Sequence, residues 1–170
     1  MALSRIEADR YLAPRMEIDL GALVRKCVEE NRPLAERRGC AIATEIEEGV
    51  PAILGDETQL LQLADNLLGN AIRYGCTEGC DTVSVAVRRS GRDRVRLAVS
   101  DKGPGIAPEH LPRLTERFYR VDAARSRNSG GTGLGLAIVK HIAERHRGTL
   151  NIASALGTGT TITVDLPIAR

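Results

Sequence analysis

The chain reads Asn128-Ser-Gly-Gly-Thr-Gly-Leu-Gly-Leu-Ala-Ile-Val-Lys-His141 at the point where a glycine-dense loop runs without a break into an apolar helical pattern. Glycine allows the backbone to approach an anion closely and to adopt a positive φ angle. A helix that begins at Leu134 would add unpaired N–H groups and the positive end of its dipole. The stretch predicts a phosphate-binding loop, although a flexible connection between helices has a similar composition.

Three common phosphate-binding motifs are excluded by the residues around the glycines. A Walker loop needs lysine directly after glycine, and none of the lysines (Lys26, Lys102 and Lys140) follows one. The Rossmann spacing of glycines at i, i+2 and i+5 is not met in any candidate set. A protein-kinase catalytic loop is also missing, because glycine and not aspartate follows His146-Arg147.

Length and composition indicate one domain of ordinary size. The chain has 170 residues, of which 42% are hydrophobic and 27% charged, values that are typical of a globular protein. It contains no run of about eighteen apolar residues and no signal-peptide pattern. We therefore expect a cytoplasmic domain that makes no contact with a membrane.

The charge pattern argues against nucleic acid as a partner. The net charge is only +2, and one phenylalanine and three tyrosines offer little surface for stacking bases. Five arginines nevertheless lie close together in the sequence, and we expect them to form the solvated tip of a β-hairpin. They are Arg88, Arg89, Arg92, Arg94 and Arg96.

The cysteines do not have the spacing of a metal site. Cys76 and Cys80 are separated by three residues, Cys27 and Cys40 lie far from them in sequence, and no histidine stands at zinc-finger spacing. We interpret all four as free thiols in a reducing compartment.

Hydrophobic periodicity divides the chain into helices and strands. Apolar residues at intervals of three and four predict helices from Asp19 to Gly39, from Asp56 to about Gly75 and from Leu134 to about His146. Asp19 and Asp56 are the expected N-caps, and Gln59 completes capping-box spacing with Asp56. Alternation predicts strands over residues 40–46, 51–54, 83–87, 95–99, 149–154 and 161–166.

These elements predict an α+β fold. We expect a two-layer α/β sandwich, in which a mixed, mostly antiparallel sheet is covered on one face by about three helices. Residues 1–14 have helix-forming composition up to Pro14 and are expected to be the tail of a preceding helix and a linker. Residues 15–170 are expected to form the folded domain.

Two asparagines interrupt the leucine-rich helix. Asn66 and Asn70 are four residues apart and therefore point the same way, with Arg73 and Tyr74 one turn further on. The pair could be polar residues on an exposed stripe. Alternatively, a carboxamide oxygen can ligate Mg²⁺ without adding negative charge beside a triphosphate.

An aspartate follows directly on an apolar strand in Asp101-Lys-Gly-Pro-Gly-Ile106. An ordinary Asp-x-Gly turn would explain the pattern. The carboxylate could instead accept a hydrogen bond from the exocyclic amine of adenine, with a bare backbone at Gly103 and Gly105 and apolar walls from Ile106 and Leu136.

Five motifs together resemble the N, G1, F, G2 and G3 boxes of bacterial sensor histidine kinases. They are Asn66-x-x-x-Asn70-Ala-Ile-Arg-Tyr74, Asp101-x-Gly-x-Gly105, Phe118-Tyr-Arg120, Gly131-Thr-Gly-Leu-Gly-Leu136 and Gly157-Thr-Gly-Thr160. The segment from Leu114 to Asp122, with Ala124-Arg-Ser126, is most similar to phosphate-regulon sensor kinases. The resemblance implies a Bergerat ATP-binding fold, shared with gyrase, heat-shock chaperone and mismatch-repair ATPases.

The resemblance also implies roles for individual residues, with ATP and Mg²⁺ as the ligands. Asn70 matches the metal ligand, with Asn66 beside it, and Asp101 matches the adenine acceptor. The other residues implied to bind nucleotide are Arg73, Tyr74, Gly103, Gly105, Ile106, Gly131, Thr132, Gly133, Leu134, Gly135, Leu136 and Thr160. Residues 121–132 match a mobile lid, and Arg120 and Arg125 are expected to face the γ-phosphate during catalysis.

A missing base favours phosphate transfer over hydrolysis. Hydrolysing members of the superfamily carry glutamate four residues before the metal asparagine, and this chain has Asn66 there. An amide cannot take a proton, and Asp65 is about 100° round the helix and is expected to point elsewhere. We therefore expect a protein-histidine kinase domain with very slow hydrolysis.

The phosphoacceptor is expected on another domain. Family acceptors lie in a His-Glu/Asp-x-x-x-Pro context, which His110, His141 and His146 all lack. The expected partners are the kinase's own dimerisation domain and, through it, a response regulator. We expect this fragment to be monomeric and unable to phosphorylate itself, and the full-length protein to be a homodimer that missing N-terminal segments could anchor in the inner membrane.

The sequence leaves two alternative functions open. A nucleotide-binding pseudokinase would signal through conformation alone, and intact motifs argue against it. An anti-sigma-type serine kinase typically carries glutamate in the N box, so Asn66 disfavours it.

Overall fold

A sheet whose central strands alternate buried and more accessible side chains builds the centre of the molecule. The computed structural model describes residues 16–76, 81–116 and 135–169. Within them, one sheet has the order β2-β4-β5-β7-β6, and only β2 and β4 pair in parallel. These strands are β2 (Ala41–Ile46), β4 (Thr82–Ser90), β5 (Arg94–Asp101), β6 (Thr149–Ala155) and β7 (Gly159–Pro167).

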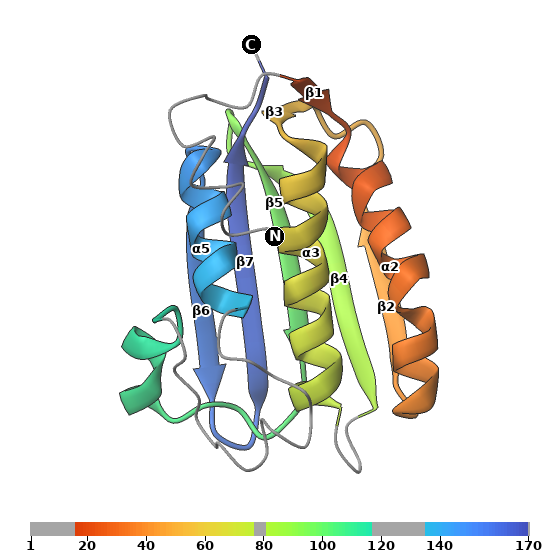
Figure 1. The fold of residues 1–170 in the computed structure, drawn as a ribbon, viewed down its shortest axis with the longest axis vertical. Helices are drawn as coiled ribbons and strands as arrows, with labels where there is room; N and C mark the ends of the chain where they lie inside the picture. Colours follow the sequence, from red (N-terminus) through yellow and green to blue (C-terminus); the bar gives the residue numbers. More distant parts are fainter. Residues whose placement is uncertain (1–15, 77–80, 117–134, 170) are drawn as a thin grey trace.

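Among the described residues, three helices cover one face of this sheet, and the expected two-layer, mixed α+β sandwich is confirmed (Figure 1). They are α2 (Leu20–Arg37), α3 (Glu57–Asn70) and α5 (Gly135–Arg145). The core lies between the layers, because the alternate valines of β4 and β5 face the helices and are almost fully buried. Val85, for example, pairs with Val99, and both are at most 4% exposed.

The predicted N-caps hold the first turns of two helices. The Asp19 carboxylate accepts a hydrogen bond from the Ala22 N–H, and that of Asp56 accepts one from the Gln59 N–H. The capping box itself was predicted wrongly. The Gln59 side chain does not turn back to Asp56 but accepts a hydrogen bond from Arg145 Nε at 3.2 Å, since the end of α5 packs beside the start of α3.

Two short elements were not predicted, and the helix predicted from Asp56 to about Gly75 ends in a π-helical turn. The strand β1 (Met16–Ile18) pairs with β3 (Ile53–Gly55) in a separate two-stranded sheet. A π-helical turn, η1 (Ala71–Gly75), continues α3, and a 3-10 helix, η2 (Pro108–Arg113), follows β5. Elements of three to six residues are too short for periodicity to detect.

The prediction that all cysteines are free is wrong. Cys40 and Cys76 form a disulfide, whereas Cys27 is free and buried. The helices α2 and α3 run side by side and end at the same end of the molecule (Figure 1), so the residues that follow them meet although they are 36 positions apart in sequence.

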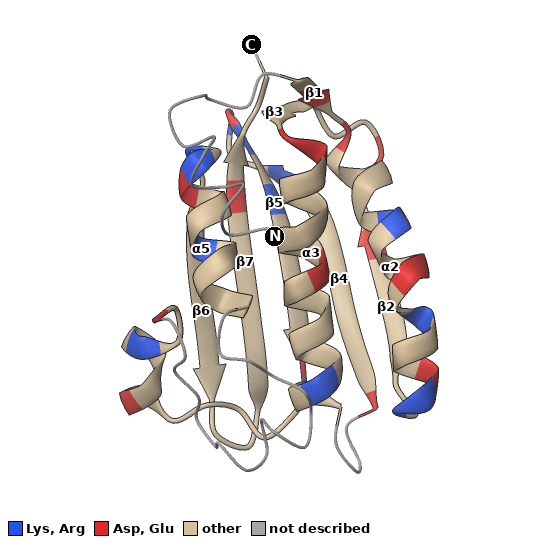
Figure 2. Ribbon diagram, viewed as in Figure 1, with Lys and Arg blue, Asp and Glu red and all other residues tan. Residues whose placement is uncertain are grey.

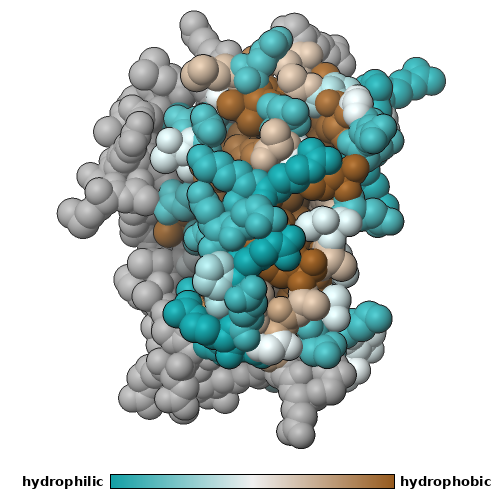
Figure 3. Space-filling model, turned by 90° about the vertical axis from the view of Figure 1, so that its right-hand side faces the viewer, coloured by the Kyte–Doolittle hydropathy of each residue, from teal (hydrophilic) through white to brown (hydrophobic). Residues whose placement is uncertain are grey.

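The arginine cluster is only partly a hairpin tip. Arg92 lies in the turn, but Arg96 lies within β5 and makes a two-bond ion pair with Asp165 of β7, at 2.7 and 3.0 Å. Figure 2 shows further charges along the outer side of α2. Figure 3 shows the side formed by α2 and the edge strand β2, where hydrophilic residues surround smaller apolar areas. Within the described ranges, no helix is long and apolar enough to span a membrane.

Candidate functional site

The predicted site residues that the structure describes lie at one end of the sandwich. At this end α3 and η1 finish, α5 begins, β5 finishes and the chain turns between β6 and β7 (Figure 1). The end of one helix, the start of another and two strand connections therefore meet there. The first and last of these predicted site residues, Asn66 and Thr160, are 94 positions apart in the sequence.

Asn66 and Asn70 face the first residue of α5. The Asn66 side-chain amide donates a hydrogen bond to the Gly135 carbonyl at 3.4 Å. A Cβ atom built on Gly135 would lie 3.6 Å from Asn70 Nδ2 and 3.8 Å from its Oδ1. The pair is therefore not an exposed polar stripe, because it lies where α3 meets the start of α5.

Asp65 points away from that junction, as the helical geometry predicts. Its carboxylate accepts a hydrogen bond from the Asn31 side chain on α2 at 2.9 Å. Asn31 is buried and also donates to the Cys27 carbonyl at 2.9 Å. The nearest carboxylate in sequence to Asn66 is thus engaged on the side of α3 that faces α2.

The turn η1 carries Arg73 and Tyr74 beyond the end of α3. Both residues are half-buried. The Arg73 carbonyl accepts a hydrogen bond from Arg38 Nη1, at 3.4 Å, so the end of α2 supports the turn. The Arg73 guanidinium lies near Gly69, one turn back, on the same end of α3 as Asn70.

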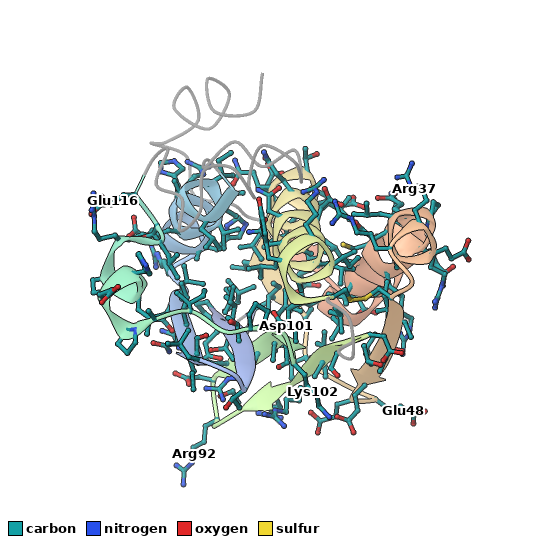
Figure 4. All side chains as sticks on the ribbon, turned by 90° about the horizontal axis from the view of Figure 1, so that it is seen from below. Arg37, Glu48, Arg92, Asp101, Lys102 and Glu116 are labelled. Atoms are coloured by element: carbon teal, nitrogen blue, oxygen red, sulfur yellow. A yellow bond between two sulfur atoms is a disulfide. The ribbon has the colours of Figure 1, made fainter. Side chains whose placement is uncertain are left out.

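Asp101 lies at the end of β5, against two glycines. Its Oδ1 accepts a hydrogen bond from the Gly103 N–H at 2.9 Å. A Cβ on Gly75 would overlap the Asp101 side chain, and one on Gly103 would lie 2.8 Å from the Gly75 Cα. Lys102 is exposed on the other side of the sheet (Figure 4), so its side chain does not enter the site.

Thr160 stands next to Asp101 across the sheet. The two residues are register partners in β5 and β7, and Thr160 is also the partner of Ser154 in β6. The hydroxyls of Ser154 and Thr160 are 2.8 Å apart, and Ser154 Oγ accepts a hydrogen bond from the Ile106 N–H at 2.8 Å. These contacts place Asp101, Thr160 and Ser154 in one row at the end of three neighbouring strands.

Sequence reasoning missed Ser154, which connects the loop after β5 to Thr160. The available signal was its position at the end of the alternating run 149–154, just before the Gly157-Thr-Gly-Thr160 motif. Gly105 was predicted and has a φ of +76°, and a Cβ there would overlap the Ala155 carbonyl. Glycine is therefore required where this loop crosses the β6–β7 turn.

Two apolar residues were predicted to form walls around the adenine ring. Ile106 and Leu136 are both half-buried, and Leu136 packs against the core. The remaining predicted residues lie outside the described ranges, as does the segment expected to form a lid. They are Arg120, Arg125, Gly131, Thr132, Gly133 and Leu134.

His146 connects the far ends of the two helices that border the site. Its Nε2 accepts a hydrogen bond from the Asp56 N–H at 3.1 Å, so Nδ1 carries the proton and donates to the Ile142 carbonyl at 2.8 Å. The pKa of His146 is lowered, mainly because burial disfavours its charged form; the Ile142 carbonyl opposes this, and nearby Arg145 adds to the lowering. Neutral His146 therefore holds α5 against α3.

The donor set at this end suits a magnesium ion that arrives with a polyphosphate. Among the described residues, no group of three or more histidine, cysteine, aspartate or glutamate side chains could hold a metal alone. Mg²⁺ commonly keeps several waters and takes few protein oxygens together with substrate phosphates. A single carboxamide oxygen at Asn70 is compatible with that pattern.

A known protein family matches most of the chain. Residues 55–170 match the family described as "Histidine kinase-, DNA gyrase B-, and HSP90-like ATPase". The matched range contains both asparagines, Asp101 and Thr160.

Curated relatives match over almost the whole chain. The sensor-like histidine kinase SenX3 of Mycobacterium tuberculosis is 40% identical over 165 residues, covering 97% of this chain and 39% of the relative. The phosphate regulon sensor protein PhoR of Pseudomonas aeruginosa is 39% identical over 170 residues, covering 100% of this chain and 38% of the relative. The chain thus spans about two fifths of the length of these relatives.

Solved structures share the fold. Full-length ShkA in complex with AMPPNP superposes with a TM-score of 0.78 at 33% identity, covering 91% of this chain and 31% of that chain. The mycobacterial sensor histidine kinase MprB superposes with a TM-score of 0.75 at 26% identity, covering 92% of this chain and 99% of that chain.

Proposed function

This chain belongs to the histidine kinase-, DNA gyrase B- and HSP90-like ATPase family, and we propose that it is the ATP-binding catalytic domain of a sensor histidine kinase. In this proposal it donates the γ-phosphate of ATP to a histidine on a dimerisation domain. The observation that carries the proposal is the meeting of the Asn66–Asn70 pair with Gly135 at one end of the fold, close to Asp101 and Thr160.

Asp101 reads the adenine ring in this account. One carboxylate oxygen already accepts the Gly103 N–H, which orients the group at the end of β5. The other oxygen accepts a hydrogen bond from the exocyclic amine, a donor that adenine has and guanine lacks at that position. The backbone of Gly75 and Gly103 lies close enough to Asp101 to form the floor of the base pocket.

The phosphates lie toward the start of α5. The N–H groups of its first turn have no partner within the helix and attract an anion. The Asn70 carboxamide lies beside Gly135, where its oxygen would contribute one ligand to Mg²⁺. A bound Mg²⁺ would supply positive charge that stabilises the charge developing on the phosphates, and Asn70 is the residue that would hold it.

The placement of carboxylates favours a phosphate donor over a hydrolase. Asn66 occupies the position from which glutamate activates water in the hydrolysing relatives, and its amide is bonded to the Gly135 carbonyl. Asp65 is bonded to Asn31 on the other side of α3. Without a general base at the metal, an external nucleophile with its own base accepts the phosphate more readily than water does.

The acceptor and the further partners follow from the relatives as proposals. SenX3 and PhoR are named a sensor-like histidine kinase and a sensor protein, and each is more than twice as long as this chain. We infer that a dimerisation domain presents the histidine, that a response regulator takes the phosphate from it, and that the domain works in the cytoplasm as part of a homodimer.

Nucleotide selectivity tests this proposal directly. Isothermal titration with ADP and with GDP, each with Mg²⁺, measures whether the site reads adenine. The proposal expects ADP to bind at least about tenfold more tightly, which corresponds to about 1.4 kcal/mol. Equal affinities for the two nucleotides would show that Asp101 does not have the assigned role.

A further inference from the structure

The disulfide between Cys40 and Cys76 ties two segments at the edge of the proposed base pocket. Cys40 is 8% exposed, follows the end of α2 and donates its N–H to the Ala35 carbonyl at 2.8 Å. Cys76 is partly exposed and directly follows η1. The two Cα atoms are 6.0 Å apart, a separation common to disulfides, so the bond can form and break without moving the backbone far (the bond is yellow in Figure 4).

The other described cysteine is unsuited to thiol chemistry. Cys27 is buried within α2, and burial raises its pKa to about 12, with further contributions from Asp65 and Glu30. Because the thiolate is the reactive form, this residue is inert near neutral pH. Within the described ranges, thiol exchange is therefore confined to the Cys40–Cys76 pair.

The bond acts on the turn that supports Asp101. Cys76 is covalently adjacent to Gly75, whose Cα lies against the Asp101 side chain. One turn earlier, the Arg73 carbonyl accepts a hydrogen bond from Arg38, two residues before Cys40. With the disulfide closed, η1 is thus attached to the end of α2 at two points. With it open, a single exposed hydrogen bond of 3.4 Å remains among these contacts.

We propose that Cys40 and Cys76 form a reversible thiol–disulfide modification site whose oxidation tightens nucleotide binding at Asp101. The thiol–disulfide exchange does not depend on the proposed ATP-binding function. Its effect on nucleotide affinity does rest on that function. Holding Gly75 in place before the ligand arrives removes part of the ordering cost of binding.

A low-molecular-weight disulfide such as oxidised glutathione is the co-reactant. The partly exposed Cys76 thiolate attacks one of its sulfur atoms, so that a mixed disulfide forms and one glutathione thiolate leaves. The Cys40 thiolate then attacks Cys76 Sγ, and a second glutathione leaves. The protein loses two electrons and two protons, and these appear in two molecules of reduced glutathione. An excess of reduced glutathione reverses both steps.

Two effects are expected from oxidation. Closing a loop between residues 36 positions apart restricts the unfolded chain and raises the melting temperature by roughly 5–15 °C. Preorganising η1 tightens the binding of Mg²⁺–ADP by roughly three- to tenfold.

The test compares the whole chain equilibrated with oxidised or with reduced glutathione. Differential alkylation and peptide mass mapping identify which cysteines are bonded, thermal melts report stability, and isothermal titration with Mg²⁺–ADP reports affinity. Cys76→Ser removes the pair, and its melting temperature and affinity should match those of the reduced wild type in both buffers. Cys80→Ser is the matched control, because it deletes a thiol four positions after Cys76 in the sequence and should keep the full response to oxidation.

The possible outcomes separate the claims. A Cys76–Cys80 bond in place of Cys40–Cys76, or no bond at all with oxidised glutathione, overturns the modification site. A Cys40–Cys76 bond that leaves ADP affinity unchanged overturns the regulation but not the proposed function. A bond that raises the melting temperature in a protein that binds ADP in neither state overturns the proposed function, and the effect on affinity with it.

Discussion

The Cα of Gly75 lies directly against the side chain of Asp101, so that a Cβ atom added to Gly75 would overlap the carboxylate. The contact joins the turn after α3 to the end of β5, two segments that the sequence separates by a strand hairpin. It brings the turn that follows Asn70 against the proposed adenine acceptor. The position of Asp101 therefore depends on the absence of a side chain at Gly75.

Replacing Gly75 by alanine should damage both the fold and the site. Because Asp101 or η1 must move, we expect Gly75→Ala to lower the free energy of unfolding by about 1–3 kcal/mol and ADP affinity by about tenfold. Urea unfolding and isothermal titration measure the two effects. Gly69→Ala is the matched control, since its Cβ would meet only the flexible end of Arg73, at 3.4 Å. Equal behaviour of the two variants would refute the role of the contact.

Substituting Asp101 tests the reading of adenine separately from the fold. Asp101→Asn retains an oxygen that can accept the Gly103 N–H but loses the charged acceptor for the exocyclic amine. We expect ADP affinity to fall by about ten- to a hundredfold, as is usual for a lost hydrogen bond to a charged group. Asp93→Asn, which makes the same change in the β4–β5 turn, should bind normally. An unchanged ADP affinity in Asp101→Asn would exclude the assigned role.

A negative charge at Asn70 should affect phosphate transfer more than stability. Asn70→Asp keeps the side-chain volume but places a carboxylate beside the triphosphate, where it alters metal geometry and repels phosphate. Gln62→Glu adds the same charge eight residues earlier on α3, about 12 Å away along the helix. Phosphate transfer from labelled ATP to a separately supplied dimerisation domain should fall at least about tenfold, or about 1.4 kcal/mol, in Asn70→Asp but not in Gln62→Glu. The melting temperatures of both variants should stay near that of the wild type. Similar losses in both variants would indicate a nonspecific charge effect.

The buried His146 predicts a loss of stability in acid. Its folded-state pKa lies below the ordinary value of about 6.5, so the unfolded chain binds a proton more readily. The stabilising contribution is complete above about pH 6.5 and is lost as the pH falls from there toward the folded pKa, by at most about 1.4 kcal/mol per pH unit. Urea unfolding between about pH 8 and about pH 5 measures this change in the free energy of unfolding. That range extends about one and a half pH units to each side of the ordinary histidine pKa of about 6.5.

His146→Gln is the matched variant for the acid experiment. Glutamine offers an acceptor for the Asp56 N–H but does not titrate. The variant should therefore depend less on pH than the wild type over the same range. An identical pH profile in the two proteins would assign the acid sensitivity to other groups.

Local signals in the sequence were sufficient for the main elements. Asp19 and Asp56 cap the helices that periodicity indicated, and the alternating valines of β4 and β5 face the core. The spacing of Asn66 and Asn70 placed both on one side of α3, and Asp65 on another. Each of these features depends only on residues within a few turns of one another.

Features that depend on distant partners could not be derived in the same way. The Cys40–Cys76 bond, the Asp56–His146 hydrogen bond and the Arg96–Asp165 ion pair join residues 36, 90 and 69 positions apart. Gln59 shows the limit most clearly, because capping-box spacing is present and Arg145 of α5 nevertheless takes its side chain. Tertiary packing decided the outcome there, against the local pattern.

The proposed transfer of the γ-phosphate to a histidine is tested most directly with labelled ATP. The chain is incubated with γ-labelled ATP and Mg²⁺, alone and with the separately expressed dimerisation domain of a sensor histidine kinase. We predict no label on this chain alone, label on the dimerisation domain that requires its histidine, and loss of that label in acid, because phosphohistidine is acid-labile. Acid-stable label on this chain alone would indicate serine or threonine chemistry and contradict the account.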